Sequence, residues 1–177
     1  MSKRYNSKNI INYGLCIALV YIATRFINIP GPTEGSLFHL GNVMLFTIAI
    51  VFGKKTGAIA GAFGMALFDI TSSYVIWAPF TFIIRFCMGY SLGYLSNVKS
   101  KNKTFEKVML FAGLFLSSLI MVVGYYLTEA VLYSNIYIPI ESLFGNIMQC
   151  VIGIVGALPL SIIIKSAMKK MNMYKSE

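Results

Sequence analysis

Charged residues are scarce in this sequence: Asp, Glu, Lys and Arg make up 12% of its 177 residues, whereas hydrophobic residues make up 57%. A soluble domain has about a quarter of its residues charged and at most about half of them apolar. The composition therefore excludes an ordinary soluble domain and predicts that much of the surface faces lipid. The formal net charge is +9, but the basic residues form short clusters between apolar runs. That arrangement is typical of membrane topology and argues against a nucleic-acid-binding face.

Histidine and cysteine are also rare. The single histidine, His39, excludes a histidine-based metal site such as H-E-x-x-H. The three cysteines, Cys16, Cys87 and Cys150, lie in different apolar runs, so we interpret them as small buried hydrophobic residues rather than metal ligands or disulfide partners. The sequence contains no Walker A motif and no G-x-S-x-G motif. We therefore expect no catalytic residue, no cofactor and no ATP use by this chain itself.

Long apolar runs dominate the chain, and they occupy residues 10–27, 37–52, 57–71, 79–95, 108–133 and 143–165. A helix needs about 17–25 residues to cross a bilayer, so the first, fifth and sixth runs pass and the others are at or below the limit. Residues 53–56 are expected to form a tight basic turn, and residues 77–79 to interrupt a helix at Pro79. We predict an all-α integral membrane protein, a bundle of six transmembrane helices in a single domain spanning residues 1–177.

The positive charges predict the orientation of this bundle. With six spans, 13 of the 15 Lys and Arg residues fall on one side, in clusters before the first helix, between the second and third, between the fourth and fifth, and after the sixth. Cytoplasmic loops carry the excess of Lys and Arg in membrane proteins. Both termini are therefore predicted to be cytoplasmic, in a multi-pass protein of the cell membrane.

Small residues recur at helical spacing. Gly57, Gly61 and Gly64 share one face of the third run, as Gly89 and Gly93 do in the fourth. Small residues let transmembrane helices approach closely, so we interpret these five as packing positions within the bundle. Gly14 and Ala18 form a further pair of small residues in the first run. For this pair, packing within the bundle and docking of a partner are equally open interpretations.

Two positive charges lie outside the basic clusters. Arg25 is near the outer end of the first run and can extend its side chain to the interface. Arg85 lies well inside the fourth run, where an unpaired charge costs several kcal/mol and is found facing a bundle interior or a cavity. Four of the six acidic residues fall in the outer half of the predicted bundle and are candidate partners. They are Glu34, Asp69, Glu129 and Glu141.

Polar and aromatic residues converge on this outer half, which predicts a pocket for a small polar ligand. In it Glu129 or Glu141 would balance Arg85 or accept a hydrogen bond from the ligand. The alternative is that these residues form interhelical hydrogen bonds without a ligand, and His39 is expected at the interface. The candidate ligand-binding residues are Asn42, Trp77, Arg85, Tyr125, Tyr126, Glu129, Glu141, Asn146 and Gln149.

Several segments resemble the substrate-binding S components of energy-coupling factor (ECF) vitamin transporters. HLGNVMLFTIAIVFGKKTGAIAGAFGMALFDI, residues 39–70, is similar to that family's second and third helices, and YVIWAPFTFIIRFCMGYSLGYL, residues 74–95, to its fourth. GYYLTEAVLY and PIESLFGNIMQCVIGIVGALPL resemble its fifth and sixth, including the E…N-x-x-Q pattern at Glu141, Asn146 and Gln149. Asn42 stands where the family usually has an aspartate, and Arg85 where relatives often have lysine.

The resemblance implies a high-affinity vitamin-binding subunit that encloses its ligand near the outer face. It would dock on a transmembrane T subunit driven by two ATPase subunits, and the family's docking signature A-x-x-x-A corresponds to Gly14-x-x-x-Ala18. Hydroxymethylpyrimidine or a pyridoxine-like compound is the favoured ligand, with riboflavin, folate and pantothenate as alternatives. An energy-independent carrier or channel, and a membrane enzyme or assembly factor without a recognisable motif, are the hypotheses from other classes.

Overall fold

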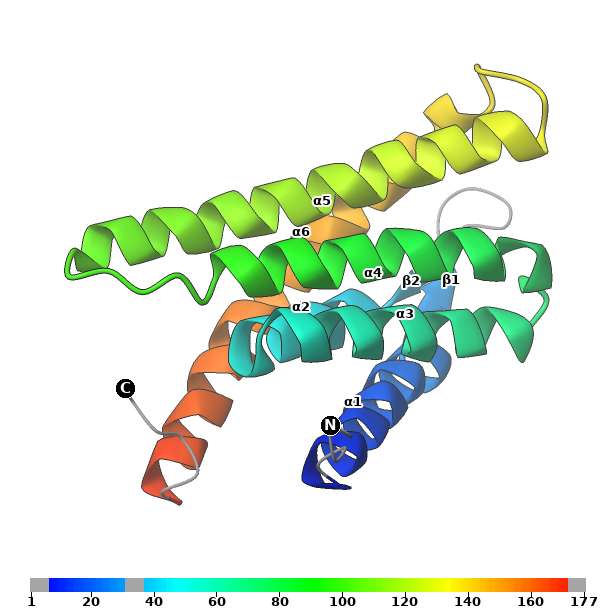
Figure 1. Cartoon of the computed structure of the whole chain (residues 1–177). Coiled ribbons are helices and arrows are strands. Elements are labelled where there is room, and N and C mark those ends of the chain that lie inside the picture. Colours follow the sequence, from blue (N-terminus) through cyan, green and yellow to red (C-terminus); the bar gives the residue numbers. More distant parts are fainter. Residues whose placement is uncertain (1–6, 31–36, 172–177) are drawn as a thin grey trace, which may run out of the picture.

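The computed structural model describes residues 7–30 and 37–171 of the chain (Figure 1). Expectations that concern Glu34, or the basic residues Lys3, Arg4 and Lys175, lie outside these residues. Six α-helices make up most of the described chain, together with one turn of 3-10 helix and a short pair of antiparallel strands. The elements are α1 (Ser7–Phe26), β1 (Asn28–Pro30), β2 (Leu37–His39), α2 (Gly41–Phe52), α3 (Lys54–Ile70), η1 (Val75–Trp77), α4 (Ala78–Leu95), α5 (Lys103–Leu132) and α6 (Pro139–Lys170).

The prediction of a helical membrane protein is confirmed. Four helical segments are long and apolar enough to cross a bilayer, and they correspond to α1, to η1 with α4, to α5 and to α6. The two others are shorter, because α2 has 12 residues and α3 has 17. They are nevertheless the most enclosed helices of the bundle: ten residues of each are buried. Figure 1 shows α3, α4 and α5 lying side by side, with α1 on the far side of α3 and α6 crossing behind.

Local signals set the helix boundaries, and two of them differ from expectation. Gly53 alone joins α2 to α3, with a φ of +82°, a conformation that side chains disfavour. The predicted turn at residues 53–56 is therefore wrong in extent, because Lys54, Lys55 and Thr56 form the first turn of α3. The predicted second helix also begins later, since Leu37–His39 pair with Asn28–Pro30 as strands.

Other boundaries follow from capping. α5 begins five residues before its apolar run, because the Asn102 side chain accepts hydrogen bonds from the backbone N–H groups of Thr104 and Phe105. Pro79 lies in the first turn of α4, where its missing N–H has no cost. The expected interruption before this helix is confirmed by η1, which ends at Trp77.

The glycines of α3 and α4 bring the two backbones into contact. A Cβ atom added to Gly89 would overlap the backbone of Gly57, and one added to Gly93 would lie 2.6 Å from the Cα of Lys54. A Cβ on Gly64 would lie 2.7 Å from the Cβ of Val20 on α1. Any side chain at these positions would therefore separate the helices, which confirms the predicted packing role of these glycines.

Candidate functional site

The antiparallel order of the helices brings five helix ends together beside the end of α1, which leads into β1. The starts of α2, α4 and α6 and the ends of α3 and α5 lie at the end of the bundle that also holds the β1–β2 pair (Figure 1). Polar residues that the sequence places far apart therefore share one layer. We call this layer the polar belt, and we define it by His39, Asn42, Thr81, Arg85, Tyr125 and Gln149.

Arg85 is the centre of the polar belt and has only 3% of its surface exposed. Its Nη1 donates to Oδ1 of Asn42 on α2 and lies 3.3 Å from the sulfur of Met121 on α5. Its Nε donates to the hydroxyl of Tyr125 at 3.2 Å, and its guanidinium carbon lies 5.1 Å from the centre of the Tyr125 ring. Arg85 thus connects α4 to α2 and α5 through neutral partners.

Asn42 and Gln149 extend the belt to α6. The side chain of Asn42 is fully buried, and its Nδ2 donates to the backbone oxygen of Gln149 at 3.3 Å. The Gln149 side chain accepts from the backbone N–H of His39 at 3.2 Å and donates to its carbonyl oxygen. Gln149, the eleventh residue of α6, therefore holds β2 against that helix through one accepted and one donated hydrogen bond.

His39 completes this end of the belt as a neutral imidazole. Desolvation, and next the positive charge of Arg85, lower the pKa of His39 to about 3. The uncharged ring can accept a hydrogen bond, and its Nδ1 lies 3.1 Å from the backbone nitrogen of Gly41. His39 therefore contacts the predicted site residue Gln149, while its position at the membrane interface stays a prediction.

Tyr125 supplies the aromatic wall. Its hydroxyl lies 3.2 Å from Oγ1 of Thr81 in addition to the Arg85 contact. Trp77 is next to it, with ring centres 6.3 Å apart and planes inclined by 47°. A planar ligand beside Tyr125 would find aromatic surface and hydrogen-bonding groups within the same layer.

Four of the nine predicted ligand-binding residues lie outside the polar belt and the aromatic wall that Trp77 and Tyr125 form. The Tyr126 hydroxyl donates to the backbone oxygen of Ile136 at 2.8 Å, which fixes the connection between α5 and α6. The Glu129 carboxylate accepts from the Ser142 hydroxyl, and Glu141 is exposed in the first turn of α6. The fourth is Asn146, half-buried on α6, whose side chain makes no hydrogen bond within the described part of the chain.

Among the residues that the structure describes, no glutamate forms the expected ion pair with Arg85. Among residues 7–30 and 37–171 the one ion pair joins Lys103 to Glu106, at 2.9 Å and at the other end of α5. Glu129 lies one turn beyond Tyr125, at the very end of α5, and its carboxylate turns toward α6 instead. Within residues 7–30 and 37–171, Arg85 is thus a buried cation without a carboxylate in ion-pair contact.

Besides His39, which was expected only at the interface, sequence reasoning missed two residues that contact the predicted site, Thr81 and Met121. Each lies four residues before a predicted site residue, Thr81 before Arg85 and Met121 before Tyr125. Residues four apart share a helix face, so extending each candidate by one turn toward the helix start would have found both.

The predicted docking pair lies on an open face of α1. A Cβ added to Gly14 would meet no atom within 4 Å, and Ala18 is exposed. The alternative role, packing inside this bundle, is therefore wrong for these two residues among the described chain. Exposed apolar residues of the same helix, including Leu15 and Ile22, extend the uncovered surface.

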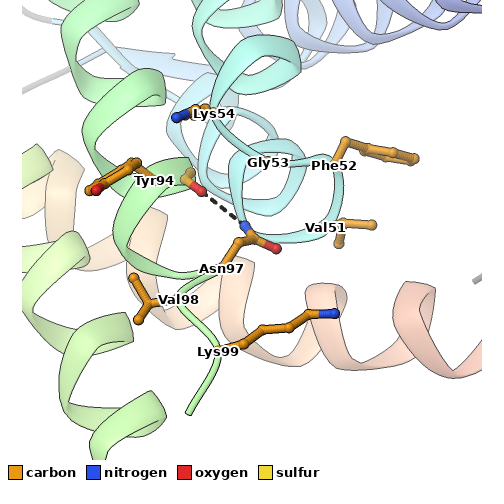
Figure 2. Close-up of a pocket in the computed structure, with 9 residues that line it drawn as sticks. Val51, Phe52, Gly53, Lys54, Tyr94, Asn97, Val98 and Lys99 are labelled. Atoms are coloured by element: carbon orange, nitrogen blue, oxygen red, sulfur yellow. Dashed lines mark hydrogen bonds between the residues drawn. The ribbon is translucent and has the colours of Figure 1, made fainter. Parts of the chain in front are cut away.

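A cavity of about 530 Å³ lies at the opposite end of the bundle, and none of the predicted site residues lines it. Figure 2 shows Asn97 there, with its amide donating to the backbone oxygen of Gly93 at 3.0 Å. Asn97 also reaches the last turn of α2, at the oxygens of Ala49 and Ile50, both 3.4 Å away. This side chain therefore holds the end of α2 against α4.

Comparison with known proteins decides the family. A family model described as "ECF-type riboflavin transporter, S component" matches residues 4–166. The chain belongs to the ECF-type S-component family. The resemblance seen in the sequence is thereby confirmed, and this S component is a multi-pass membrane subunit of a transporter rather than an enzyme.

Two curated relatives of this S component are similar over most of their length. The thiamine precursor transporter HmpT of Lactococcus lactis subsp. cremoris (strain MG1363) is 30% identical over 161 residues, covering 90% of this chain and 89% of that protein. An uncharacterized protein of Pyrococcus woesei is 31% identical over 149 residues, covering 82% of this chain and 94% of that protein.

Proposed function

We propose that this S component binds a small water-soluble vitamin or vitamin precursor and delivers it to an ECF-type ABC importer. Hydroxymethylpyrimidine is the favoured ligand, because HmpT is named for a thiamine precursor, and a pyridoxine-like ring has a similar size. Riboflavin, named in the matching family description, stays an alternative, as do folate and pantothenate. The observation that carries the proposal is the buried Arg85, surrounded by amide and phenol groups and, in the described part of the chain, without a carboxylate in ion-pair contact.

The polar belt is proposed as the ligand site. A desolvated guanidinium is a strong donor to a ring nitrogen, and the amides of Asn42 and Gln149 offer donors and acceptors in the same layer. Tyr125 and Trp77 would cover the ring face. The remaining predicted residues would line the approach to the belt from the α5–α6 connection. These are Tyr126, Glu129, Glu141 and Asn146.

The proposed partners are a transmembrane T subunit and two ATPase subunits in the plasma membrane. The sequence contains no nucleotide-binding motif, so energy has to come from other chains. The open face of α1 at Gly14 and Ala18 is the proposed contact with the T subunit, since small residues permit close helix approach.

Native mass spectrometry tests this function. Protein purified from cells supplied with hydroxymethylpyrimidine is expected to retain one ligand molecule. Labelled hydroxymethylpyrimidine is expected to accumulate in proteoliposomes only when the T subunit and both ATPases are present with ATP. The matched control is the same complex with ATPases unable to hydrolyse ATP. Uptake by this chain alone would establish the energy-independent carrier instead, and retention of another vitamin would replace hydroxymethylpyrimidine.

Cysteine labelling tests the proposed orientation. On a background lacking Cys16, Cys87 and Cys150, a cysteine at Tyr137 in the α5–α6 connection is expected to react with an impermeant reagent added outside the cell. A cysteine at Lys101 is expected to react only after lysis, because the basic connections are proposed to be cytoplasmic. Both positions are exposed, so accessibility within the protein is matched. Outside labelling at Lys101 would refute six spans with cytoplasmic termini.

A further inference from the structure

Asp69 carries a buried carboxylate oxygen without a partner. In the part of the chain that the structure describes, two buried side-chain oxygens lack a hydrogen bond, Oδ2 of Asp69 and Oγ of Ser118. Only 7% of the Asp69 surface is exposed. Burying an unpaired carboxylate is far more costly than burying an unpaired hydroxyl. A ligand that donates a hydrogen bond to Asp69 would therefore gain more free energy than one that donates to Ser118.

Asp69 lies beside the polar belt, in the last turn of α3. The Thr81 hydroxyl and the charge of Arg85, both on α4, are close enough to act on its carboxylate, although burial is the larger influence on it. Thr81 in turn lies 3.2 Å from the Tyr125 hydroxyl, which accepts from Nε of Arg85. Asp69 and Arg85 are not within ion-pair distance of each other. One layer thus contains two opposite charges that do not touch.

Arg85 also has donor capacity left. The hydrogen bonds that it makes within the described chain run through Nε and Nη1, to Tyr125, Asn42 and two methionine sulfurs. A guanidinium has five N–H donors in a planar fork, and Nη2 makes no hydrogen bond to the described chain. A ligand that donates to Asp69 and accepts from Arg85 would satisfy both charges at once.

We infer that Asp69 is a specificity-determining residue of the ligand site, where it accepts a hydrogen bond from an amino group on a heteroaromatic ring whose neighbouring ring nitrogen accepts from Arg85. The ligand class is thus an aminopyrimidine, with donor and acceptor side by side on one ring edge. The inference rests on the proposed function. It adds to that function one binding residue and one chemical requirement on the ligand.

The inference is tested by comparing how wild-type protein and Asp69 variants bind two probes. The probes are 4-amino-5-hydroxymethyl-2-methylpyrimidine and the same compound without its amino group. For Asp69→Ala, calorimetry in detergent is expected to give an affinity loss of about 10- to 100-fold for the amino compound, because a buried donor is left unpaired. Asp69→Ala is expected to bind the deaminated probe with the same affinity as the wild-type protein does. Asp69→Asn, which keeps one acceptor oxygen, is expected to lose less.

Ser118→Ala is the matched control, since it removes the other unpartnered buried oxygen. It is expected to bind both probes like wild type. The thermal midpoint of ligand-free Asp69→Ala is expected to be at or above that of wild type, because an uncompensated charge is removed. A merely structural carboxylate would lower the midpoint instead.

Equal losses for both probes in Asp69→Ala and Asp69→Asn would overturn the inference and leave the proposed function standing. If Asp69→Ala does not fold, the same comparison is made with Asp69→Asn. A loss of affinity for the amino compound alone would support the inference, and no such selective loss would overturn it. Wild-type protein that binds neither probe would overturn the proposed pyrimidine ligand itself, and the role of Asp69 with it.

Discussion

Gly14→Leu and Ala18→Leu are expected to abolish uptake while leaving ligand affinity unchanged. Both residues lie on the open face of α1, and a side chain at Gly14 meets no atom of this bundle within 4 Å. A leucine therefore does not disturb the fold, but it prevents a second helix from approaching closely. The measurements are calorimetry on the isolated S component and transport by the assembled complex in proteoliposomes.

Ala112→Leu provides the matched control. Ala112 is likewise a small exposed residue, but it lies on α5, away from the proposed contact with the T subunit. Uptake by this variant is expected to match wild type. Loss of binding together with uptake in Gly14→Leu would show that α1 supports the ligand site, and wild-type uptake would place the docking surface elsewhere.

Arg85→Ala and Gln149→Ala are expected to give the largest losses of ligand affinity. Arg85 lies at the centre of the polar belt and Gln149 links the belt to His39. Each deletion removes a side chain proposed to contact the ligand, so a polar atom of the bound ligand is buried without its partner. One buried unsatisfied group costs about 1–3 kcal/mol, which corresponds to roughly tenfold to a hundredfold in affinity. Asn146→Ala is expected to lose a similar amount, because Asn146 is proposed to contact the ligand from the approach to the belt.

Arg85→Lys separates charge from geometry. It keeps the positive charge but replaces the planar fork with a single ammonium group, so a loss smaller than that of Arg85→Ala is expected. The affinities are to be measured by calorimetry on monodisperse protein with a wild-type thermal midpoint. Wild-type affinity in all of these variants would mean that the polar belt only connects helices and that the ligand binds elsewhere.

The sequence predicted the helices and the unusual position of Arg85 because both depend on local chemistry. A long apolar run needs no tertiary information to be recognised as a helix in lipid. A charge inside such a run is costly in any bundle, which singles out Arg85. The convergence of Asn42, Tyr125 and Gln149 on one layer followed from alternating helix direction alone.

The partners within the layer were less predictable. Whether Glu129 faces Arg85 or Ser142 depends on the rotation of α5 about its axis, and no sequence signal sets that rotation. Asp69 was recognised as an outer-half acid, but its missing hydrogen bond is a property of the packed bundle. The short strands beside α2 were also missed, because an apolar segment as short as Leu37–His39 does not distinguish a strand from the start of a helix.

The brevity of α2 has a consequence for biosynthesis. Its 12 residues span about 18 Å, well short of a hydrocarbon core of about 30 Å. Such a segment is a poor substrate for independent insertion, and Gly53 leaves no loop between it and α3. The two helices therefore have to leave the translocon as one hairpin, and α2 reaches its enclosed place only after α4 and α6 have been synthesised to cover it. The proposed ligand site, which has Asn42 at the start of α2, is completed only in that last stage of assembly.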